Sequence, residues 1–288
     1  MTKKPKVVAI IPARYASTRF PGKPLALILG TPMIQHVYER VSESKQVNEV
    51  FIATDDWRIA EAVDSFGGKF VMTSPKLKCG TDRCAAAARK CAADIVVNVQ
   101  GDEPIISPKT IDATITALLR PNGKGIRSGN ESMSTAAVPI RDYDTLFSHN
   151  AVKVVVDTNG NAMYFTRSTI PFLRGVHQQN YLAADGTSEK HFRFLKHLGL
   201  YVYRNDFLQE LTRLKETPLE KVEKLEQLRV LEHGYKIKVA VVAEDTISVD
   251  VPSDLAAVEY FLSSQYQVEY PDNTKHDQFT GRRKKKGI

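Results

Sequence analysis

Residues 7–25, VVAIIPARYASTRFPGKPL, join a continuous apolar run to a loop rich in arginine, serine, glycine and proline. The run Val7–Ile11 has no polar position, which is typical of a strand covered on both faces within a parallel sheet. Pro12 ends the run, and three cations follow in the loop. The stretch therefore predicts a buried first strand whose carboxyl end leads into a basic loop.

Apolar runs alternate with helical patterns from residue 7 to residue 104. Strands that alternate with helices in this order form a parallel sheet with helices on both faces. The sequence therefore predicts an α/β fold with an open, mostly parallel, doubly wound sheet. Helices are expected over 33–44, 57–66 and 83–92, and strands over 50–53, 69–72 and 95–99.

This arrangement also predicts where a ligand would bind. Open α/β sheets bind ligands in the crevice beyond the carboxyl ends of their strands. We therefore expect the loops 12–24, 73–82 and 100–104 to line one cleft.

The second half of the chain has a different pattern, and about 134–207 are expected to form a mixed extension of the sheet. Strands are expected over 134–139, 152–156, 198–203, 236–243 and 246–249. Helices are expected over 219–233 and from Pro252 to residue 262. Loops are expected at 121–133, flexible by composition, and at 175–190, long and mobile.

Composition places the chain among ordinary globular proteins, with 42% hydrophobic and 25% charged residues. No stretch approaches the roughly 18 uninterrupted apolar residues of a membrane span. The amino-terminal apolar run is too short for a signal peptide. The three cysteines have no C-x-x-C spacing, so neither a disulfide framework nor a zinc site is indicated. We therefore expect a cytoplasmic protein without membrane insertion, whose cysteines are small buried or half-buried residues.

The formal net charge of +7 is concentrated at the two ends of the chain. Residues 1–6 contribute +3 and residues 265–288 another +3, so the body, residues 7–264, carries +1. A basic nucleic-acid-binding face is therefore not indicated. The sequence predicts a basic amino-terminal arm, one main domain over 7–264 and a disordered basic tail.

The loop after the first strand could wrap a polyphosphate, because backbone N–H groups and cationic heads bind non-bridging oxygens at short range. It is not a P-loop, because Ser17 stands where that motif needs glycine and Pro24 where it needs serine or threonine. From residue types alone, phosphate binding and a solvated charged surface are equally good interpretations.

Two aspartates stand at the ends of predicted strands, Asp102 and Asp250. Mg²⁺ takes oxygen ligands, usually from one or two carboxylates together with substrate phosphates. The alternative for either aspartate is a turn or a helix N-cap. The pair predicts a magnesium site.

Five separated motifs of the chain resemble one enzyme family. They are IIPARYASTRFPGKPL (10–25), NVQGDEP (98–104), HLGLYVYR (197–204), KLEQLRVLEHG (224–234) and VDVPSDL (249–255). In this order and spacing they resemble the 3-deoxy-manno-octulosonate (Kdo) cytidylyltransferases, over residues 7 to about 262. The resemblance implies a nucleotide-diphospho-sugar transferase-like fold and a homodimer. It also implies transfer of CMP from CTP to the anomeric hydroxyl of Kdo, a 2-keto-3-deoxy sugar acid, for lipopolysaccharide biosynthesis.

The resemblance further implies a set of site residues. Those implied in catalysis are Arg14, Lys23, Asp102 and Asp250, and the two aspartates would hold Mg²⁺. Those implied in nucleotide binding are Arg14, Ser17, Arg19, Lys23, Gly80, Thr81 and Arg83. Those implied around the sugar are Gln100, Arg167, His197, Tyr201, Glu226 and Gln227.

The chain departs from the family pattern before the third helix. The family usually has His-x-Ser-Gly-Thr-Glu/Asp-Arg near the nucleotide base, whereas residues 76–83 are KLKCGTDR. Cys79 thus replaces a hydroxyl with a weakly bonding thiol, which alters the implied contact with cytosine. The alternatives are a cytidylyltransferase for 8-amino-Kdo or a sialic-acid-like sugar and, outside the enzymes, a nucleotide-sensing or RNA-associated protein.

Overall fold

The computed structural model describes residues 4–17, 19–120, 131–183, 186–188 and 192–265. The loop expected at 121–133 lies outside these residues except for its last three positions, and the tail expected at 265–288 lies outside except for Gln265. Of the expected amino-terminal arm, residues 4–6 are described, and the Lys6 ammonium lies 2.5 Å from a Glu49 carboxylate oxygen.

The amino-terminal half forms four parallel strands, so the predicted α/β fold is confirmed. They are β1 (Val7–Ala13), β4 (Glu49–Thr54), β5 (Phe70–Met72) and β6 (Ile95–Val99), in the spatial order β5-β4-β1-β6. In β1, Ile10 lies opposite Phe51 of β4 and Asn98 of β6. The chain adds strands first on one side of β1 and then on the other. The carboxyl ends of β1 and β6 therefore form the switch point at which such sheets bind ligands.

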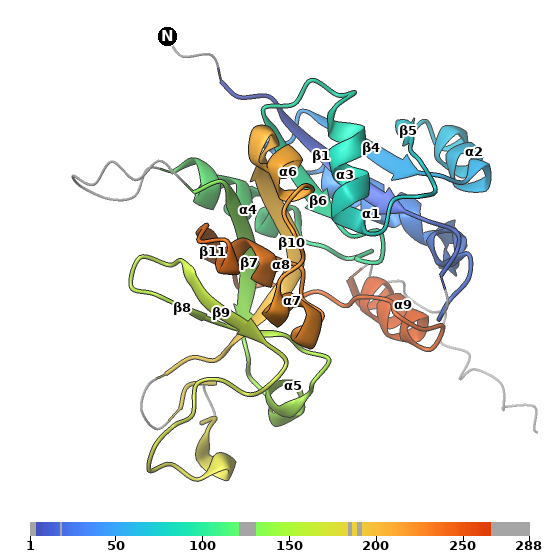
Figure 1. Ribbon diagram of the computed structural model, residues 1–288. Helices are drawn as coiled ribbons and strands as arrows, with labels where there is room; N and C mark the ends of the chain where they lie inside the picture. The colour runs from blue at the N-terminus through green and yellow to red at the C-terminus, as the bar shows by residue number, and fades with distance from the viewer. Residues whose placement is uncertain (1–3, 18, 121–130, 184–185, 189–191, 266–288) are drawn as a thin grey trace, which may run out of the picture.

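Helices cover both faces of this sheet (Figure 1). One face carries α1 (Met33–Ser42), α2 (Trp57–Ser65) and α4 (Pro108–Leu119). The other carries α3 (Gly80–Ala88), α6 (Asn205–Leu211) and α8 (Gln227–Glu232). The apolar run of β1 serves both layers, because side chains alternate along a strand. Its Val8 and Ile10 pack with the second group of helices, and its odd-numbered residues pack with the first.

The sheet continues beyond β6 with strands of both directions. β10 (Leu195–Arg204) is antiparallel to β6 and to β7 (Met133–Pro139), and β11 (Ile237–Val241) is parallel to β7. β8 (Lys153–Val156) and β9 (Ala162–Thr166) form a hairpin that branches from β10. The predicted mixed extension therefore has two parts, strands that continue the main sheet and a hairpin beside it (Figure 1).

The pairing of β10 with β7 contains a bulge. Leu198 lies opposite Ala136 but Tyr201 lies opposite Thr135, so Gly199 and Leu200 are extra residues on β10. The Thr135 hydroxyl donates to the Leu200 carbonyl at 2.7 Å. This bond satisfies a backbone acceptor that the bulge removes from the ladder with β7.

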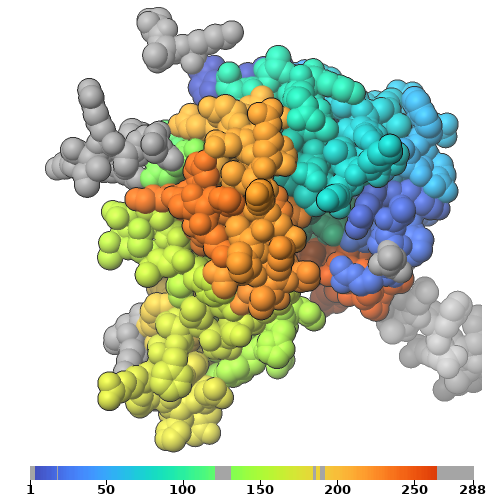
Figure 2. Space-filling view, in the orientation of Figure 1, coloured from blue at the N-terminus to red at the C-terminus, as the bar shows by residue number. Residues whose placement is uncertain are grey.

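Short elements complete the described chain. The segment expected as a long mobile loop, 175–190, contains the buried Tyr181, which stacks on Phe194 with ring centroids 5.7 Å apart. With Ile140, Leu146 and Leu173 they form a small apolar cluster, within the yellow and green lobe of Figure 2. The described part of this segment is therefore anchored by side-chain packing. The short elements are η1 (Lys23–Leu25), β2 (Leu27–Ile28), β3 (Thr31–Pro32), α5 (Tyr143–Phe147), η2 (Gln178–Asn180) and α7 (Pro218–Glu223). The longer helix α9 (Asp254–Gln265) ends the described chain.

One predicted helix is wrong. The helix expected over 219–233 is divided into α7 and α8, because Lys224 adopts a left-handed backbone conformation with φ 56°. The Lys224 N–H donates to the Glu220 carbonyl at 2.8 Å and so ends α7 in the manner of a left-handed C-cap. Leu225 and Leu228 still face the core, so the hydrophobic pattern does not reveal the break.

Two further expectations are corrected. The strand expected over 246–249, all described residues, is wrong. This segment leaves the sheet and crosses beyond β6, where the Val249 N–H donates to the Asp102 carbonyl at 2.9 Å. The helix expected over 83–92 spans 80–88. It begins early because the Cys79 sulfur accepts the Asp82 N–H at 3.4 Å.

Within the described residues, none of the helices combines the length and the apolar character that crossing a membrane requires.

Substitution of Lys224 tests the break between α7 and α8. Lys224→Val should have a free energy of unfolding about 1 kcal/mol lower than Lys224→Gly, because a β-branched residue is strained in the left-handed region and glycine is not. Urea unfolding measures both variants. Lys221→Val, at an exposed position within α7, controls for the loss of a lysine from this surface. Equal stability of the two Lys224 variants would contradict the left-handed conformation.

Candidate functional site

The three loops that were predicted to share a cleft do so. They line a hollow of about 380 Å³ at the carboxyl ends of β1 and β6, which we call the basic hollow. Segment 249–251 and the start of α8 complete its wall through Asp250 and Glu226. The charged side chains that line it are Arg14, Arg19, Lys23, Lys78, Arg83, Asp102, Glu226 and Asp250.

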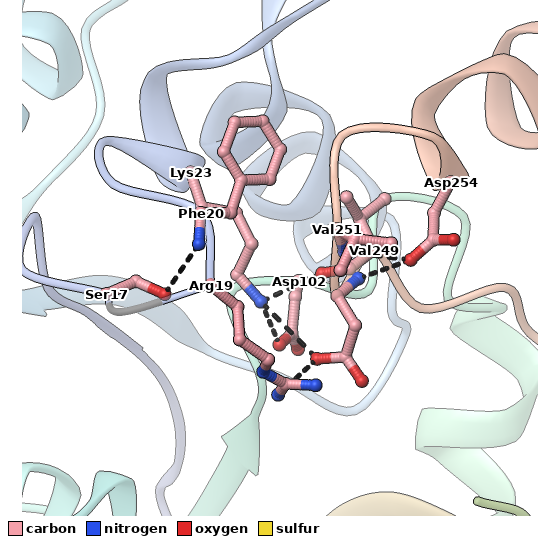
Figure 3. Close-up of polar contacts among 9 residues, drawn as sticks. Ser17, Arg19, Phe20, Lys23, Asp102, Val249, Val251 and Asp254 are labelled. Carbon is pink, nitrogen blue, oxygen red and sulfur yellow. Dashed lines mark hydrogen bonds and ion pairs between the residues drawn. The ribbon is translucent and has the colours of Figure 1, made fainter.

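Lys23 makes the central contacts of the basic hollow (Figure 3). Its ammonium lies 2.6 Å from an Asp102 carboxylate oxygen and 2.8 Å from the Val249 carbonyl oxygen. An Asp250 carboxylate oxygen lies 3.9 Å from the same nitrogen and 2.8 Å from the Arg19 guanidinium. Because the Lys23 side chain is only 15% exposed, solvent screens its attraction to Asp102 incompletely. Two carboxylates from distant parts of the chain therefore converge on one cation.

The loops of the basic hollow pack most closely at two glycines, Gly22 and Gly101. Gly22 has φ 70°, and a Cβ there would lie 3.1 Å from a ring carbon of Tyr15. A Cβ at Gly101 would lie 2.9 Å from the Pro12 carbonyl oxygen. Only glycine fits these positions without a shift of the chain. The Gly22 N–H donates to the Tyr15 carbonyl at 2.9 Å, which closes the basic loop immediately before Lys23.

The other residues of this loop that were predicted to bind the nucleotide lie towards the solvent. Arg14 and Arg19 are exposed and line the basic hollow, and the Ser17 hydroxyl accepts the Phe20 N–H at 3.4 Å (Figure 3). Lys78 is also exposed and lines the same hollow. Guanidinium and ammonium groups arranged in this way suit charge-assisted bonds to phosphate oxygens.

Arg83 has protein partners already. It is 4% exposed, and its guanidinium lies 3.1 Å from an Asp55 carboxylate oxygen and 2.5 Å from the Thr73 hydroxyl. These bonds join α3 to the loops after β4 and β5. Its predicted contact with a nucleotide stays a prediction.

A second hollow of about 700 Å³, the large hollow, adjoins the first. It follows β10 towards α5 and the chain after it. The residues that line both hollows are Cys79, Gly80, Gln100 and Glu226. Of the residues predicted at the sugar, those that line the large hollow are Gln100, His197, Tyr201, Glu226 and Gln227.

Gln227 supplies an unused donor in the large hollow. It is 4% exposed, and its Oε1 accepts the Tyr201 hydroxyl at 3.2 Å. Its Nε2 has no hydrogen-bond partner among the described residues. A buried donor without a partner costs about 1–3 kcal/mol, so this amide is suited to an acceptor oxygen of a ligand. Burial raises the pKa of Tyr201, which keeps its hydroxyl protonated as the donor to Gln227.

His197 is held as one neutral tautomer. Its Nε2 lies 2.9 Å from the Thr135 hydroxyl oxygen, and that hydroxyl donates its single proton to backbone carbonyls, to Leu200 at 2.7 Å and more weakly to Leu198 at 3.4 Å. His197 must therefore donate from Nε2, which leaves Nδ1 as an acceptor. Burial lowers the pKa of His197 to about 3, so the imidazole is neutral near pH 7. Phe165 packs edge-on against the ring, with centroids 4.9 Å apart.

Burial shifts the pKa of two more groups that line the large hollow, Cys79 and Glu103. Burial raises the pKa of the Cys79 thiol to about 12, with the Glu226 carboxylate adding to the shift. Burial also raises the pKa of Glu103 to about 8, and the Asp102 charge adds to that shift. Glu226 itself is exposed and accepts the Thr81 hydroxyl at 2.8 Å. The three cysteines are free, and they are half-buried or buried as predicted.

Arg167 does not line either hollow. Its guanidinium donates to the backbone carbonyls of Glu223 and His149, each at 3.0 Å. Its predicted contact with a sugar stays a prediction. Two partners in this region were not predicted from the sequence, Thr135 behind His197 and Glu223 behind Arg167. Neither has a recognisable motif, because each acts through another residue.

About nine tenths of the chain resembles known cytidylyltransferases. Residues 8–237 match the family model described as cytidylyltransferase. The chain is 50% identical to the 3-deoxy-manno-octulosonate cytidylyltransferase of Geobacter metallireducens, over 90% of this chain and 98% of that relative. It is 49% identical to the protein of the same name from Geobacter sulfurreducens, over 88% of this chain and 97% of that relative. The chain belongs to the 3-deoxy-manno-octulosonate cytidylyltransferase family.

Solved structures agree with this family membership. A CMP:2-keto-3-deoxy-manno-octonic acid synthetase in complex with CTP has a TM-score of 0.79 and 39% identity, covering 90% of this chain and 99% of that one. A cytidylyltransferase from Leptospira borgpetersenii has a TM-score of 0.56 at 17% identity, which shows a shared fold alone. The resemblance to 3-deoxy-manno-octulosonate cytidylyltransferases that five motifs indicated is thus confirmed.

The neutral state of His197 predicts an acid-sensitive contribution to stability. Its pKa is about 3 in the folded protein, against about 6.5 when unfolded, so between these values the unfolded chain binds more protons. This contribution is complete above pH 6.5 and falls as the pH is lowered. From pH 7.0 to 5.5 the parent should lose about 1 kcal/mol more unfolding free energy than His197→Gln.

Urea unfolding at the two pH values measures this difference, with His149→Gln at an exposed position as the control. The same loss of stability in the parent and in His197→Gln would contradict a buried neutral imidazole.

Proposed function

We propose that this member of the family transfers CMP from CTP to the anomeric hydroxyl of Kdo, releasing pyrophosphate, as a step of lipopolysaccharide biosynthesis. One observation carries the proposal: a hollow rich in cations opens into a larger hollow with hydrogen-bonding walls, and four residues line both. Two substrates bound in the two hollows would meet at those residues. The Geobacter relatives bear the name of this activity, and the solved relative was obtained with CTP.

The basic hollow is the proposed site of CTP. Arg14, Arg19 and Lys23 would bind the triphosphate, with Ser17 close to them on the same loop. Gly80, Thr81 and Arg83 lie at the start of α3, where they would border the nucleotide. Because the Cys79 thiol stays protonated, it would meet the base as a weak neutral group rather than as a thiolate.

Asp102 and Asp250 fit a divalent cation. Lys23 already bridges their carboxylates, which supports their use by one ion. The described residues contain no group of three or more histidine, cysteine or acidic side chains arranged for a metal. The remaining ligands would therefore be phosphate oxygens of CTP and water, as is usual for Mg²⁺. When bound, Mg²⁺ would offset charge on the α-phosphate and acidify the attacking hydroxyl.

The large hollow is the proposed site of the sugar acid. Gln227 would donate to an acceptor oxygen of the sugar acid from Nε2, and His197 would accept from a sugar hydroxyl through Nδ1. Gln100 is oriented by the Asn98 side chain, whose Oδ1 accepts its Nε2 at 2.9 Å. Tyr201, Glu226 and Arg167 complete the proposed set. The neutral His197 is suited to orienting the sugar rather than to pairing with its carboxylate.

The transfer itself is a substitution at phosphorus. The anomeric oxygen forms a bond to the α-phosphorus while the bond from that phosphorus to the pyrophosphate oxygen breaks, and the hydroxyl proton passes to solvent. Lys23 and Arg14 would stabilise the charge that builds on the leaving pyrophosphate. Electrostatic stabilisation by fixed cations is the main contribution that this chain offers to the rate.

We also propose a homodimer, as the family implies. Two large apolar side chains near the hairpin are exposed, Met163 at 64% and Phe172 at 76%. Exposed apolar groups of this size suit a contact between copies of the chain. A cytoplasmic location remains a prediction, and so does the absence of nucleic acid among the partners.

Pyrophosphate release with CTP and a panel of Kdo, 8-amino-Kdo and sialic acid tests the proposed function. We expect turnover with Kdo that requires Mg²⁺ and is abolished by chelation. Preference for another sugar would favour one of the alternative cytidylyltransferases. The absence of turnover with every sugar would contradict the enzyme and favour a nucleotide-sensing or RNA-associated protein.

Lys23→Ala should lower turnover by about 10²–10³, because it removes a positioned cation from the leaving group. Initial rates of pyrophosphate release at saturating CTP measure the effect. Lys76→Ala is the matched control, since Lys76 is an exposed lysine near the same hollow that lines neither hollow. Turnover near the parent value in a folded Lys23→Ala protein would contradict the role of Lys23.

A further inference from the structure

Lys153 is a buried cation that lines neither hollow. It lies in β8 with 0% of its side chain exposed, and its ammonium donates to the carbonyl oxygens of Ser148, Ala151 and Arg167, each at 2.7 Å. Carbonyl oxygens only accept, so these three bonds use all three protons of a charged ammonium. Burial and the Arg167 guanidinium lower the pKa of Lys153, whereas the three carbonyl dipoles favour its charged form. The lysine therefore joins three backbone carbonyls, two from the loop 148–151 and one from Arg167.

The carbonyls of Ser148 and Ala151 belong to one wall of the large hollow. Ser148, Asn150 and Ala151 line it, and the neighbouring Val152 carbonyl accepts the His197 N–H at 2.8 Å. The crosslink thus fixes the loop 148–151 immediately beside the strand that carries His197.

Arg167, which supplies the third carbonyl, connects this loop to the opposite wall of the large hollow. Glu223 accepts the Thr166 hydroxyl at 2.6 Å and the Arg167 N–H at 3.1 Å, while the Arg167 guanidinium donates to the Glu223 and His149 carbonyls. Glu223 ends α7, directly before the corner of 224–227 that lines the hollow. Lys153, Arg167 and Glu223 therefore hold two walls of the hollow in place from behind. Their formal charges sum to +1, which favours an anionic ligand.

The loop 148–151 lies at the end of the large hollow that is remote from the nucleotide. The four residues shared with the basic hollow mark one end, and none of 144–152 lines the basic hollow. In Figure 1, α5, which precedes this loop, lies far from β1 and β4. A sugar acid whose anomeric hydroxyl reaches the α-phosphate can therefore extend its other end towards 148–151.

We propose that Lys153 is a positioning residue for the sugar acid, which fixes the loop 148–151 as the wall that contacts the end of the sugar farthest from the anomeric carbon. This inference rests on the proposed function and adds the part of the site that discriminates between sugars with different substituents at that end. Lys153 itself touches neither substrate, and its effect passes through the position of the loop.

Lys153→Met tests this role, because it keeps the length of the side chain and removes the three donors. The KM for the sugar acid should rise about tenfold or more, since three buried carbonyls lose their partners and the wall moves. The KM for CTP should change little, because Ser148, Ala151 and Arg167, which accept the three bonds from Lys153, do not line the basic hollow. Discrimination between Kdo and 8-amino-Kdo should also decrease. Lys90→Met is the matched control, an exposed lysine with one carbonyl partner, that of Met72 at 3.0 Å.

Equal increases in both KM values, or an unchanged KM for the sugar acid in the folded variant, would overturn the proposal. If Lys153→Met does not fold, the same KM measurements on Glu223→Gln decide the question. This substitution weakens the same hydrogen-bond network at a partly exposed residue. A selective rise in the sugar KM supports the inference, and no rise overturns it.

Amide hydrogen exchange separates this inference from the proposed function. Exchange of residues 148–152 should be faster in Lys153→Met, or in Glu223→Gln, than in Lys90→Met, whether or not the parent turns over Kdo. A parent without turnover contradicts the proposed function, whereas unchanged exchange at 148–152 contradicts the positioning role of Lys153.

Discussion

The Lys23 ammonium, which attracts two carboxylates, holds together the chain segments at the carboxyl ends of β1 and β6. Lys23 follows β1, Asp102 follows β6, and Asp250 comes from the segment before α9, so one cluster of charges joins three distant parts of the chain. The positive charge of Lys23 attracts both carboxylates and so offsets the repulsion between them. The apolar side of the same junction is small and includes Met33, Ile105 and Val249. Charge pairing and this small cluster together dock α9 on the sheet.

The two hollows differ in how firmly other residues hold their polar side chains. In the basic hollow, long side chains such as that of Arg14 are exposed and can adjust to a phosphate chain when it binds. In the large hollow, the polar groups are set by partners behind them, as His197 is by Thr135 and Gln227 is by Tyr201. A triphosphate is recognised by its charge, which tolerates flexible contacts, whereas a sugar acid is distinguished by the direction of each hydroxyl.

Most of the fold could be predicted because its strands are uninterrupted apolar runs and the rule for open sheets places their following loops at one edge. That rule brought Lys23 and Asp102 together from sequence alone. The break at Lys224 could not be predicted, because no glycine or asparagine marks its left-handed backbone. Residues 246–249 have the apolar character of a strand but no partner strand, and pairing is not a local property. Arg83 and Arg167 show a further limit, since the sequence does not distinguish an arginine that binds phosphate from one that binds carboxylate, hydroxyl or carbonyl groups of the protein.

The bulge of β10 restricts how this strand can vary among related sequences. Side chains alternate along a strand, so loss of a single residue between His197 and Tyr201 would turn one of the two rings through the sheet to the opposite surface. Loss of both Gly199 and Leu200 would restore the facing but would remove the carbonyl that receives the Thr135 proton. Insertions and deletions in this strand are therefore compatible with the site only in pairs, and a paired deletion would free the imidazole to exchange its tautomer.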